Sequence, residues 1–149
     1  MKNKKVFGVG LVLSLVLLLG IGFFFNYKKS KEEVDLSIAA PVMRTYAVEK
    51  YDLNVFTQVS HNNLRKTIKI NILENGKYDW LLEVDEENFK DYMEDLCNMS
   101  RDIKKVANKF LDRNDINISI RVLNDQVTNE YLIEVINGKV EFNFRDRAE

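Results

Sequence analysis

Hydrophobic residues form one uninterrupted run near the start of the chain, and they alternate or recur periodically farther on. The run extends from Val6 to Phe25 and contains no charged residue. A helix needs about 20 apolar residues to cross the hydrocarbon core of a bilayer. The pattern therefore predicts a transmembrane helix over residues 6–25, preceded by a short tail of residues 1–5.

The end of this run favours a retained anchor over a cleaved signal peptide. Secretory hydrophobic regions usually span about 7–15 residues and end at small residues next to the cleavage site. Here the run ends with Phe23–Phe25, and aromatic residues suit a membrane–water interface. Cleavage remains an open alternative, because residues 20–22 are the small-x-small tripeptide Gly-Ile-Gly.

The charges that flank the run give a weak preference for one orientation. Three lysines lie on each side: Lys2, Lys4 and Lys5 before it, and Lys28, Lys29 and Lys31 after it. The positive-inside rule compares such counts, and here the two counts are equal. The short N-terminal tail and the acidic Glu32 and Glu33 after the run then favour a cytoplasmic N-terminus. We expect residues 26–40 to form a polar tether and residues 41–149 to form an extracytoplasmic domain.

Alternating apolar and polar residues predict strands in the first half of this domain. A polar loop at residues 60–64 separates the first two of three such segments, which are residues 53–59, 68–72 and 78–84. Pro41 leaves two readings open. It fits the first turn of a helix over residues 42–51, or it precedes an extended segment.

Each of two Asn-Gly pairs predicts a hairpin turn, but the apolar pattern selects a different loop at each. At residues 75–76, a three-residue loop with Gly76 in the left-handed conformation places Ile70 and Trp80 opposite each other on one face. At residues 137–138, a two-residue loop pairs apolar residues: Val135 with Val140, Ile133 with Phe142, and Tyr131 with Phe144.

The residues between the two hairpins predict one long helix. Asp85 is suited to cap its start and Asn114 to end it, which gives about 27 residues and a length of about 40 Å. A further strand, residues 116–122, follows the helix. The apolar stripe of the helix recurs at steps of three and four: Phe89, Tyr92, Leu96, Met99, Ile103, Val106 and Phe110.

Two readings of this helix differ at the positions beside the stripe. A coiled-coil dimer carries charges there, whereas a helix that packs on a sheet widens its apolar stripe. Met93, Ser100 and Ala107 occupy these positions, which favours packing on the chain's own sheet and leaves homodimerisation as the alternative. The fold class we predict is α+β, with a mostly antiparallel sheet of two three-stranded meanders packed against one long helix.

Charge and cysteine content narrow the classes of partner. Residues from Glu32 onward hold 16 of the 22 Lys/Arg and all 23 Asp/Glu, a net charge of −7. An acidic domain repels phosphate backbones, so we expect no nucleic-acid partner. Cys97 is the only cysteine and allows no intrachain disulfide. An extracytoplasmic domain without disulfides is typical of a Gram-positive cell surface.

No pattern of residues assigns a catalytic, cofactor or metal site. His61, the only histidine, stands next to Ser60, but adjacency in sequence does not make a catalytic pair. Cys97 has acidic neighbours, which disfavour a reactive thiolate. We therefore expect no catalytic residue and no cofactor.

Two acidic clusters have explanations other than metal binding. The segment Asp112–Asp115 begins like a calcium loop, but Ile116 takes the next ligand position and no later glycine or glutamate completes the pattern. The second cluster lies where a helix dipole favours negative charge, and it consists of Glu83, Asp85, Glu86 and Glu87. We expect no bound metal.

Four apolar residues fall on the faces of the predicted strands opposite the main core: Leu81, Leu123, Leu132 and Ile136. They either cover a second layer of the same chain or form a contact patch for a partner. Cover by the chain itself, with residues 36–50 as the second layer, is the reading we favour.

These observations predict a membrane-anchored, non-enzymatic binding or accessory module outside a bacterial cell membrane, with another envelope protein as its partner. Two alternatives stay open: a small envelope hydrolase that uses His61, and a tether domain that binds cell-wall polymer. A cleft that joins His61 to a serine or aspartate would favour the hydrolase, and an exposed row of Tyr and Trp would favour the wall-binding tether. The sequence carries no motif by which we assign it to a family.

The anchor is expected to stay attached to the domain. Mass spectrometry of protein extracted from membranes should therefore detect the N-terminal peptide with Lys2 and Lys5. A mature form that begins near Phe23 and is found free in the medium would contradict this prediction.

Overall fold

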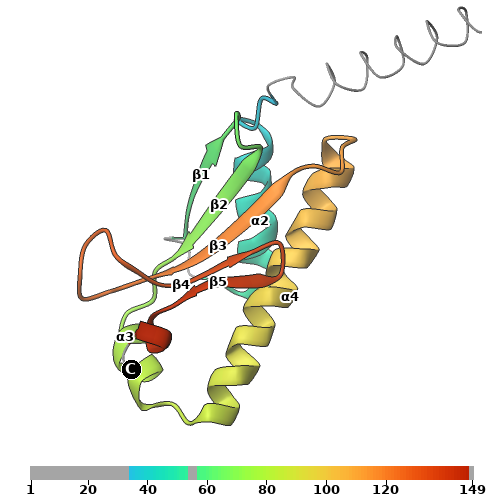
Figure 1. Ribbon diagram of the computed structural model, residues 1–149. Coiled ribbons are helices and arrows are strands. Elements are labelled where there is room, and N and C mark those ends of the chain that lie inside the picture. Colours follow the sequence, from blue (N-terminus) through green and yellow to red (C-terminus); the bar gives the residue numbers. More distant parts are fainter. Residues whose placement is uncertain (1–33, 54–56, 148–149) are drawn as a thin grey trace, which may run out of the picture. The chain divides into compact units, whose positions relative to one another are not determined.

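The computed structural model describes residues 34–53 and 57–147 (Figure 1). Predictions for the tail, the anchor and residues 26–33 of the tether lie outside the described residues. Among the described helices, none has the length and apolar character that crossing a membrane requires. The elements are α2 (Ala39–Tyr51), β1 (Gln58–Asn62), β2 (Thr67–Ile72), α3 (Lys77–Glu83), α4 (Glu86–Phe110), β3 (Asn117–Leu123), β4 (Tyr131–Ile136), β5 (Lys139–Asn143) and the 3-10 helix η1 (Phe144–Arg147).

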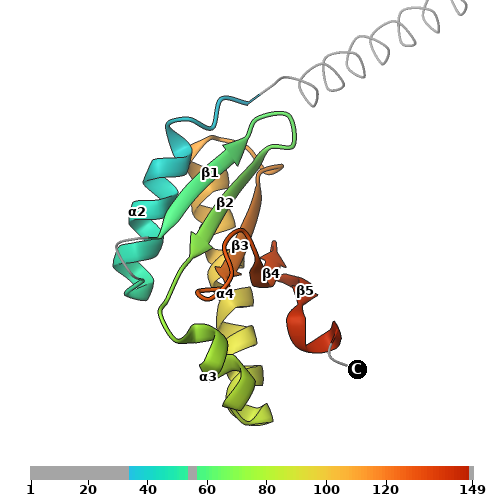
Figure 2. The ribbon, with the colours of Figure 1, turned by 90° about the vertical axis from the view of Figure 1, so that its left-hand side faces the viewer.

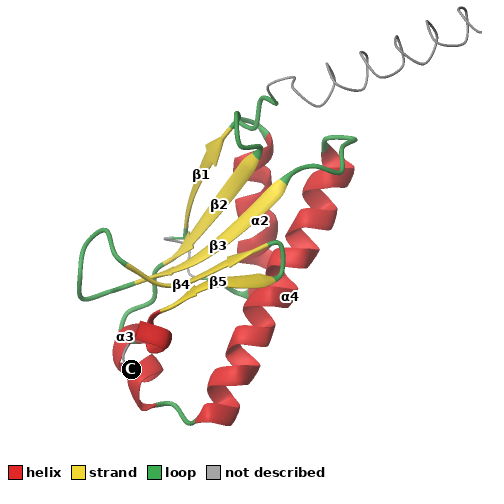
Figure 3. Cartoon of the chain, in the orientation of Figure 1, coloured by secondary structure: helices red, strands yellow, loops and turns green. Residues whose placement is uncertain are grey.

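The strands form one five-stranded sheet in the order β1-β2-β3-β4-β5. All neighbours are antiparallel except β2 and β3, which pair in parallel, with Ile68 beside Ile118 and Ile70 beside Ile120. Helices α2 and α4 contact each other and pack on the same face of the sheet (Figures 2 and 3). The predicted α+β class is confirmed, but the sheet is mixed and has five strands, so the prediction of two three-stranded meanders is wrong.

The error lies in residues 78–84: residues 78–83 belong to helix α3 and Val84 is its C-cap, so the third strand does not form. Gly76 has a φ of 74° and turns the chain into α3, so the predicted pairing of Ile70 with Trp80 does not occur. The Asp125 carboxylate accepts hydrogen bonds from the backbone N–H groups of Gly76 (2.6 Å) and Tyr78 (3.0 Å) at the start of α3. Partners that are distant in sequence therefore override the local alternation.

Arg145 secures the other end of α3. Its Nε donates to the carbonyl of Leu81 (2.9 Å), and its Nη2 donates to the carbonyl of Val84 (2.9 Å). The last carbonyls of a helix lack partners within the helix, and a cation is favoured beside them. The guanidinium also lies 4.0 Å from the centre of the Phe89 ring, which ties η1 to the junction of α3 and α4.

The hairpin at residues 137–138 follows the prediction only next to its turn. Val135 pairs with Val140 as expected, but the register shifts between Glu134 and Val135. Glu134 then pairs with Phe142, so the predicted pairing of Ile133 with Phe142 is wrong. The shift leaves Phe142 in an edge-to-face contact with Tyr131, with ring centres 5.1 Å apart.

Two further boundaries differ from the prediction. The expected loop at residues 60–64 is partly strand, because β1 extends to Asn62. The expected tether up to residue 40 overlaps the folded unit, which begins at Val34. Val34, Leu36 and the start of α2 are buried, and apolar side chains are stabilised by removal from water. The helical reading of the segment after Pro41 is correct, and the helix begins at Ala39.

Helix α4 follows the prediction closely, although it ends at Phe110 and not at Asn114. The side chain of Asp85 accepts a hydrogen bond from the backbone N–H of Asn88 (2.9 Å) and caps the helix. The positions beside the stripe, Met93, Ser100 and Ala107, are buried. The helix therefore covers the sheet with a wide face. Leu81 and Leu132 are also buried in the core, so the chain itself covers these two members of the expected apolar patch.

A carboxylate on α4 fastens α2 to it. Oδ2 of Asp102 accepts hydrogen bonds from the hydroxyls of Tyr46 (2.8 Å) and Tyr51 (2.8 Å) and forms an ion pair with Lys50. The hydrogen bonds from Lys50, Tyr51 and Tyr46 hold the pKa of Asp102 at about 2, below its ordinary value of 3.8. All three donors come from the C-terminal half of α2, so this cluster sets where α2 lies against α4.

Substitution Ala107→Glu should destabilise the domain severely. Ala107 is fully buried between α4 and the sheet, and an unpaired buried charge costs about 3–5 kcal/mol. The control Lys105→Glu changes an exposed residue of the same helix and should alter the free energy of unfolding by about 0.5 kcal/mol or less. Chemical denaturation followed by circular dichroism measures both. Near-native stability of the Ala107→Glu variant would mean that this helix face borders a dimer seam.

The Asp102 cluster should stabilise the fold only above strongly acidic pH. Because the pKa in the folded state lies below the unfolded value, the stabilisation is complete above about pH 4 and is lost as the pH falls through about 2. Asp102→Asn should therefore lower the free energy of unfolding by about 1 kcal/mol near neutral pH and by almost nothing at about pH 2. Urea denaturation across this range tests the convergence, with the exposed Asp112→Asn as a control that should stay close to the wild type at every pH.

Candidate functional site

The sheet has one face that the long helices leave uncovered. Helices α2 and α4 occupy one side, and no described helix packs over the centre of the other side (Figure 2). Cross-strand pairing aligns one residue from each strand in a row on this open face: Gln58, Asn71, Arg121, Glu134 and Phe142. The row brings polar and aromatic side chains together from segments that are far apart in the sequence.

Glu134 is the centre of this row. Its side chain belongs to a residue that is only 8% exposed, and Oε1 accepts hydrogen bonds from Ser119 Oγ (2.7 Å) and Arg121 Nε (2.8 Å). Burial alone would raise the pKa of Glu134, but these hydrogen bonds outweigh burial and hold the pKa below its ordinary value. The carboxylate is therefore ionised at neutral pH, and it positions Arg121.

Arg121 in turn orders two aromatic rings. Its guanidinium carbon lies 4.5 Å from the centre of the Tyr131 ring, and the Tyr131 ring makes an edge contact with Phe142. Such cation–π and edge-to-face contacts restrict the rings to one orientation. The open face thus presents a preorganised chain of carboxylate, guanidinium and aromatic rings.

Two cavities flank the loop between β3 and β4. The first has a volume of about 490 Å³, and we call it the aromatic cavity because four aromatic residues line it: Tyr78, Tyr131, Phe142 and Phe144. The second has a volume of about 450 Å³, and we call it the amide cavity because its lining includes Gln58, Asn71, Asn124 and Asn129. Asn124, Asn129, Glu130 and Tyr131 line both. The two cavities therefore adjoin each other.

The loop that separates these cavities is fixed to the rest of the fold. Asp125 bonds to the backbone at the start of α3, as described above. Asn124 Oδ1 accepts hydrogen bonds from the backbone N–H groups of Gln126 (2.9 Å) and Val127 (3.3 Å). Gln126 Nε2 donates to Asp79 Oδ1 (2.7 Å). These contacts hold residues 124–127, the first part of the loop, against the start of α3.

One acceptor in the amide cavity has no partner. Oδ1 of Asn71 is buried, and it has no hydrogen bond to any part of the chain that the structure describes. Buried polar atoms are nearly always paired, and an unpaired one costs about 1–3 kcal/mol. Asn71 is therefore a buried acceptor to which the described residues supply no donor.

The residues weighed as catalytic candidates lie apart from both cavities. His61 is exposed on the edge strand β1 and lines neither of them. Cys97 is half-buried on α4, and burial raises the pKa of its thiol. Neither His61 nor Cys97 lines the aromatic cavity or the amide cavity.

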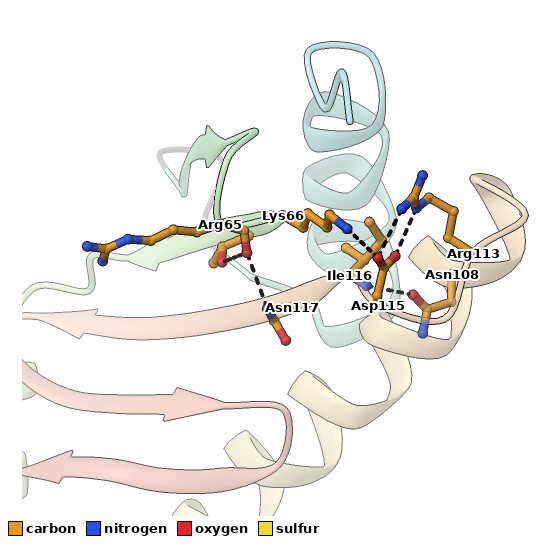
Figure 4. Close-up of polar contacts among 8 residues, drawn as sticks. Arg65, Lys66, Asn108, Arg113, Asp115, Ile116 and Asn117 are labelled. Atoms are coloured by element: carbon orange, nitrogen blue, oxygen red, sulfur yellow. Dashed lines mark hydrogen bonds and ion pairs between the residues drawn. The ribbon is translucent and has the colours of Figure 1, made fainter. Parts of the chain in front are cut away.

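The acidic segment Asp112–Asp115 serves the fold, as Figure 4 shows for Asp115. Its Oδ1 accepts from Arg113 Nε (2.8 Å), and its Oδ2 forms an ion pair with Lys66 Nζ (2.6 Å). The hydrogen bond from Arg113 is the largest cause that holds the pKa of Asp115 well below its usual range. Among residues 34–53 and 57–147, no three His, Cys, Asp or Glu side chains gather in a metal-binding arrangement.

The residues of the open face did not stand out in the sequence. The one available signal was Glu134, a single carboxylate inside the apolar segment Tyr131–Ile136. Arg121 and Asn71 are polar residues at alternating positions of their strands. Only the sheet order places them in one row with Glu134.

The described residues form an α+β domain whose open sheet face carries polar and aromatic side chains beside two cavities. No family model matches the chain, and the comparisons with curated proteins and with solved structures also find no match.

Proposed function

We propose that this protein is a membrane-anchored, non-enzymatic binding module outside a bacterial cell membrane, and that it holds another envelope protein on its open sheet face. The observation that carries the proposal is the pair of adjoining cavities around the β3–β4 loop. Concave sites with a few convergent polar groups are typical of binding surfaces.

The chemistry of this face favours a polypeptide partner. Arg and Tyr dominate the binding energy of protein interfaces, and here Arg121 stacks on Tyr131 next to both cavities. Charges of both signs surround them, since Lys69 lies beside Ser119 on the same face and Glu130 lines both cavities. Mixed charge and free amide groups complement a folded polypeptide better than they complement a polyanion.

The anchor supports the proposed location. Residues 6–25 have the length and apolar character that a membrane span requires, and the weak charge preference places the N-terminus in the cytoplasm. The domain would then face the cell wall, where a partner reaches it from the envelope. The hydrolase alternative gains no support, because His61 lines neither cavity.

A specific observation favours one second candidate, a domain that binds cell-wall glycan. Four aromatic residues line a single cavity together with the amides of Asn124, Gln126 and Asn129, and Glu130 is the one charged residue of that lining. Sugar rings have apolar faces that pack on aromatic side chains and hydroxyl groups that bond to amides. A neutral glycan would therefore suit the aromatic cavity.

Photo-crosslinking from the cavities tests the proposal. A benzophenone amino acid placed at Glu130, which is exposed and lines both cavities, should form an adduct of one defined mass with another envelope protein in intact cells. The same probe at Glu87, an exposed residue on α4, should form none. Adding Asn71→Ala to the Glu130 probe should reduce the adduct, because Asn71 is part of the lining of the amide cavity.

The outcomes separate the two candidates. An adduct of defined mass that resists glycan hydrolases supports the protein partner, whereas a heterogeneous adduct that these enzymes digest supports the glycan. Equal crosslinking from Glu130 and Glu87, or no adduct at Glu130, would overturn the open face as a binding site.

A further inference from the structure

One end of the domain gathers exposed apolar side chains that the core does not use. Three segments meet there: the start of α2, the turn between β1 and β2, and the end of α4 (Figures 1 and 2). Each carries one strongly exposed apolar residue, because Ile38 is 69%, Leu64 is 81% and Phe110 is 50% exposed.

Specific bonds hold these segments together. The backbone N–H of Leu36 donates to Asn63 Oδ1 (3.0 Å), which joins the start of α2 to the β1–β2 turn. The ion pair of Lys66 with Asp115 joins that turn to the segment between α4 and β3 (Figure 4). The backbone N–H of Asn117 also donates to the carbonyl of Lys66 (2.7 Å). The apolar residues are therefore displayed on a connected surface.

The segments at this end hold one cation more than acids in an otherwise acidic domain, and we call it the basic end. The cations are Arg65, Lys66, Lys109 and Arg113, and the acids are Asp35, Asp112 and Asp115. Of these, Arg65, Lys109, Asp35 and Asp112 are exposed. Helix α4 is polarised along its length: residues 86–97 hold Glu86, Glu87, Asp91, Glu94 and Asp95 against Lys90, and residues 98–110 hold Arg101, Lys104, Lys105 and Lys109 against Asp102. The opposite end, near α3, exposes Trp80 and Leu82 next to acidic residues.

The chain length limits how far this end lies from the predicted span. Residues 26–33 separate Phe25 from Val34, and eight residues reach at most about 28 Å when fully extended. Val34 begins the segment that Leu36 fastens to the β1–β2 turn. An anchored chain therefore keeps the basic end close to the bilayer.

We propose that this basic end, formed by Ile38, Leu64, Arg65, Lys109 and Phe110, lies on an anionic phospholipid surface. The inference rests on the proposed membrane anchor. The apolar side chains enter the headgroup region, where aromatic and aliphatic groups are favoured. The cations neutralise lipid phosphates, and each contributes about fivefold to partitioning onto an anionic surface. The open sheet face then stands free for a partner from the envelope.

Single-tryptophan variants of the full chain test this orientation. Trp80 is the only tryptophan, so the background is Trp80→Phe, and one tryptophan is added as Leu64→Trp at the basic end or as Leu82→Trp at the acidic end. Both sites are exposed, at 81% and 54%. In nanodiscs of brominated phosphatidylglycerol, the Leu64→Trp variant should lose most of its fluorescence, and the Leu82→Trp variant should keep most of it.

Charge reversal tests the electrostatic part. Arg65→Glu together with Lys109→Glu should restore much of the Leu64→Trp fluorescence, because both cations are lost from the lipid surface. Lys90→Glu, an exposed residue in the acidic half of α4, should leave the quenching unchanged. Melting temperatures close to the parent show that each variant is folded.

Two readouts separate this inference from the anchor. Protein that stays in the nanodisc fraction but shows equal quenching at both tryptophan sites, or quenching that ignores the double charge reversal, overturns the basic end as a lipid surface while the anchor stands. Protein that leaves the nanodisc fraction overturns the anchor and the inference together.

Discussion

The architecture depends on the parallel pairing of β2 with β3. Antiparallel neighbours need only a short turn, but parallel neighbours need a long crossover that leaves the sheet and returns to it. Here α3 and α4 form that crossover. Its length lets α4 return along the sheet, where it contacts β3, β4 and β5. Helix α2 fills the rest of the same face, so all the helical cover lies on one side.

One-sided cover leaves the other face of the sheet without a helical layer. On that open face, Glu134 is paired across strands with Ser119 and Arg121, whereas Asn71 Oδ1 has no partner among the described residues. The charge of the domain is also divided along α4, with acid at its start and base at its end. The open sheet face and the basic end are separate surfaces of the domain, so the two proposed interactions do not compete for the same residues.

Features that depend on neighbouring residues were predictable from the sequence. The Asp85 cap and the alternating isoleucines of β3 follow from local sequence, and the structure confirms them. The predicted stripe of α4 is confirmed in part: Phe89, Leu96, Met99 and Ile103 are buried, Tyr92 and Val106 are partly buried, and Phe110 is 50% exposed. The turn at residues 137–138 was correct for Val135 and Val140 alone, since a one-residue register shift beyond them costs little locally. Phe142 thereby left the predicted core pairing and joined Tyr131 on the open face.

The sequence by itself determined the apolar run of residues 6–25, the α+β class and the wide packing face of α4, because these follow from spacing along one segment. Only the tertiary structure decided that residues 77–83 are helical. Asp125 and Arg145 hold the two ends of α3, and they lie 47 and 64 residues away from Tyr78 and Leu81, their respective partners. The same holds for the candidate site. Asn71, Arg121 and Glu134 come from three different strands. They become neighbours only through the order of the strands in the sheet. The free energy of the whole core selects that order, and no local sequence pattern encodes it.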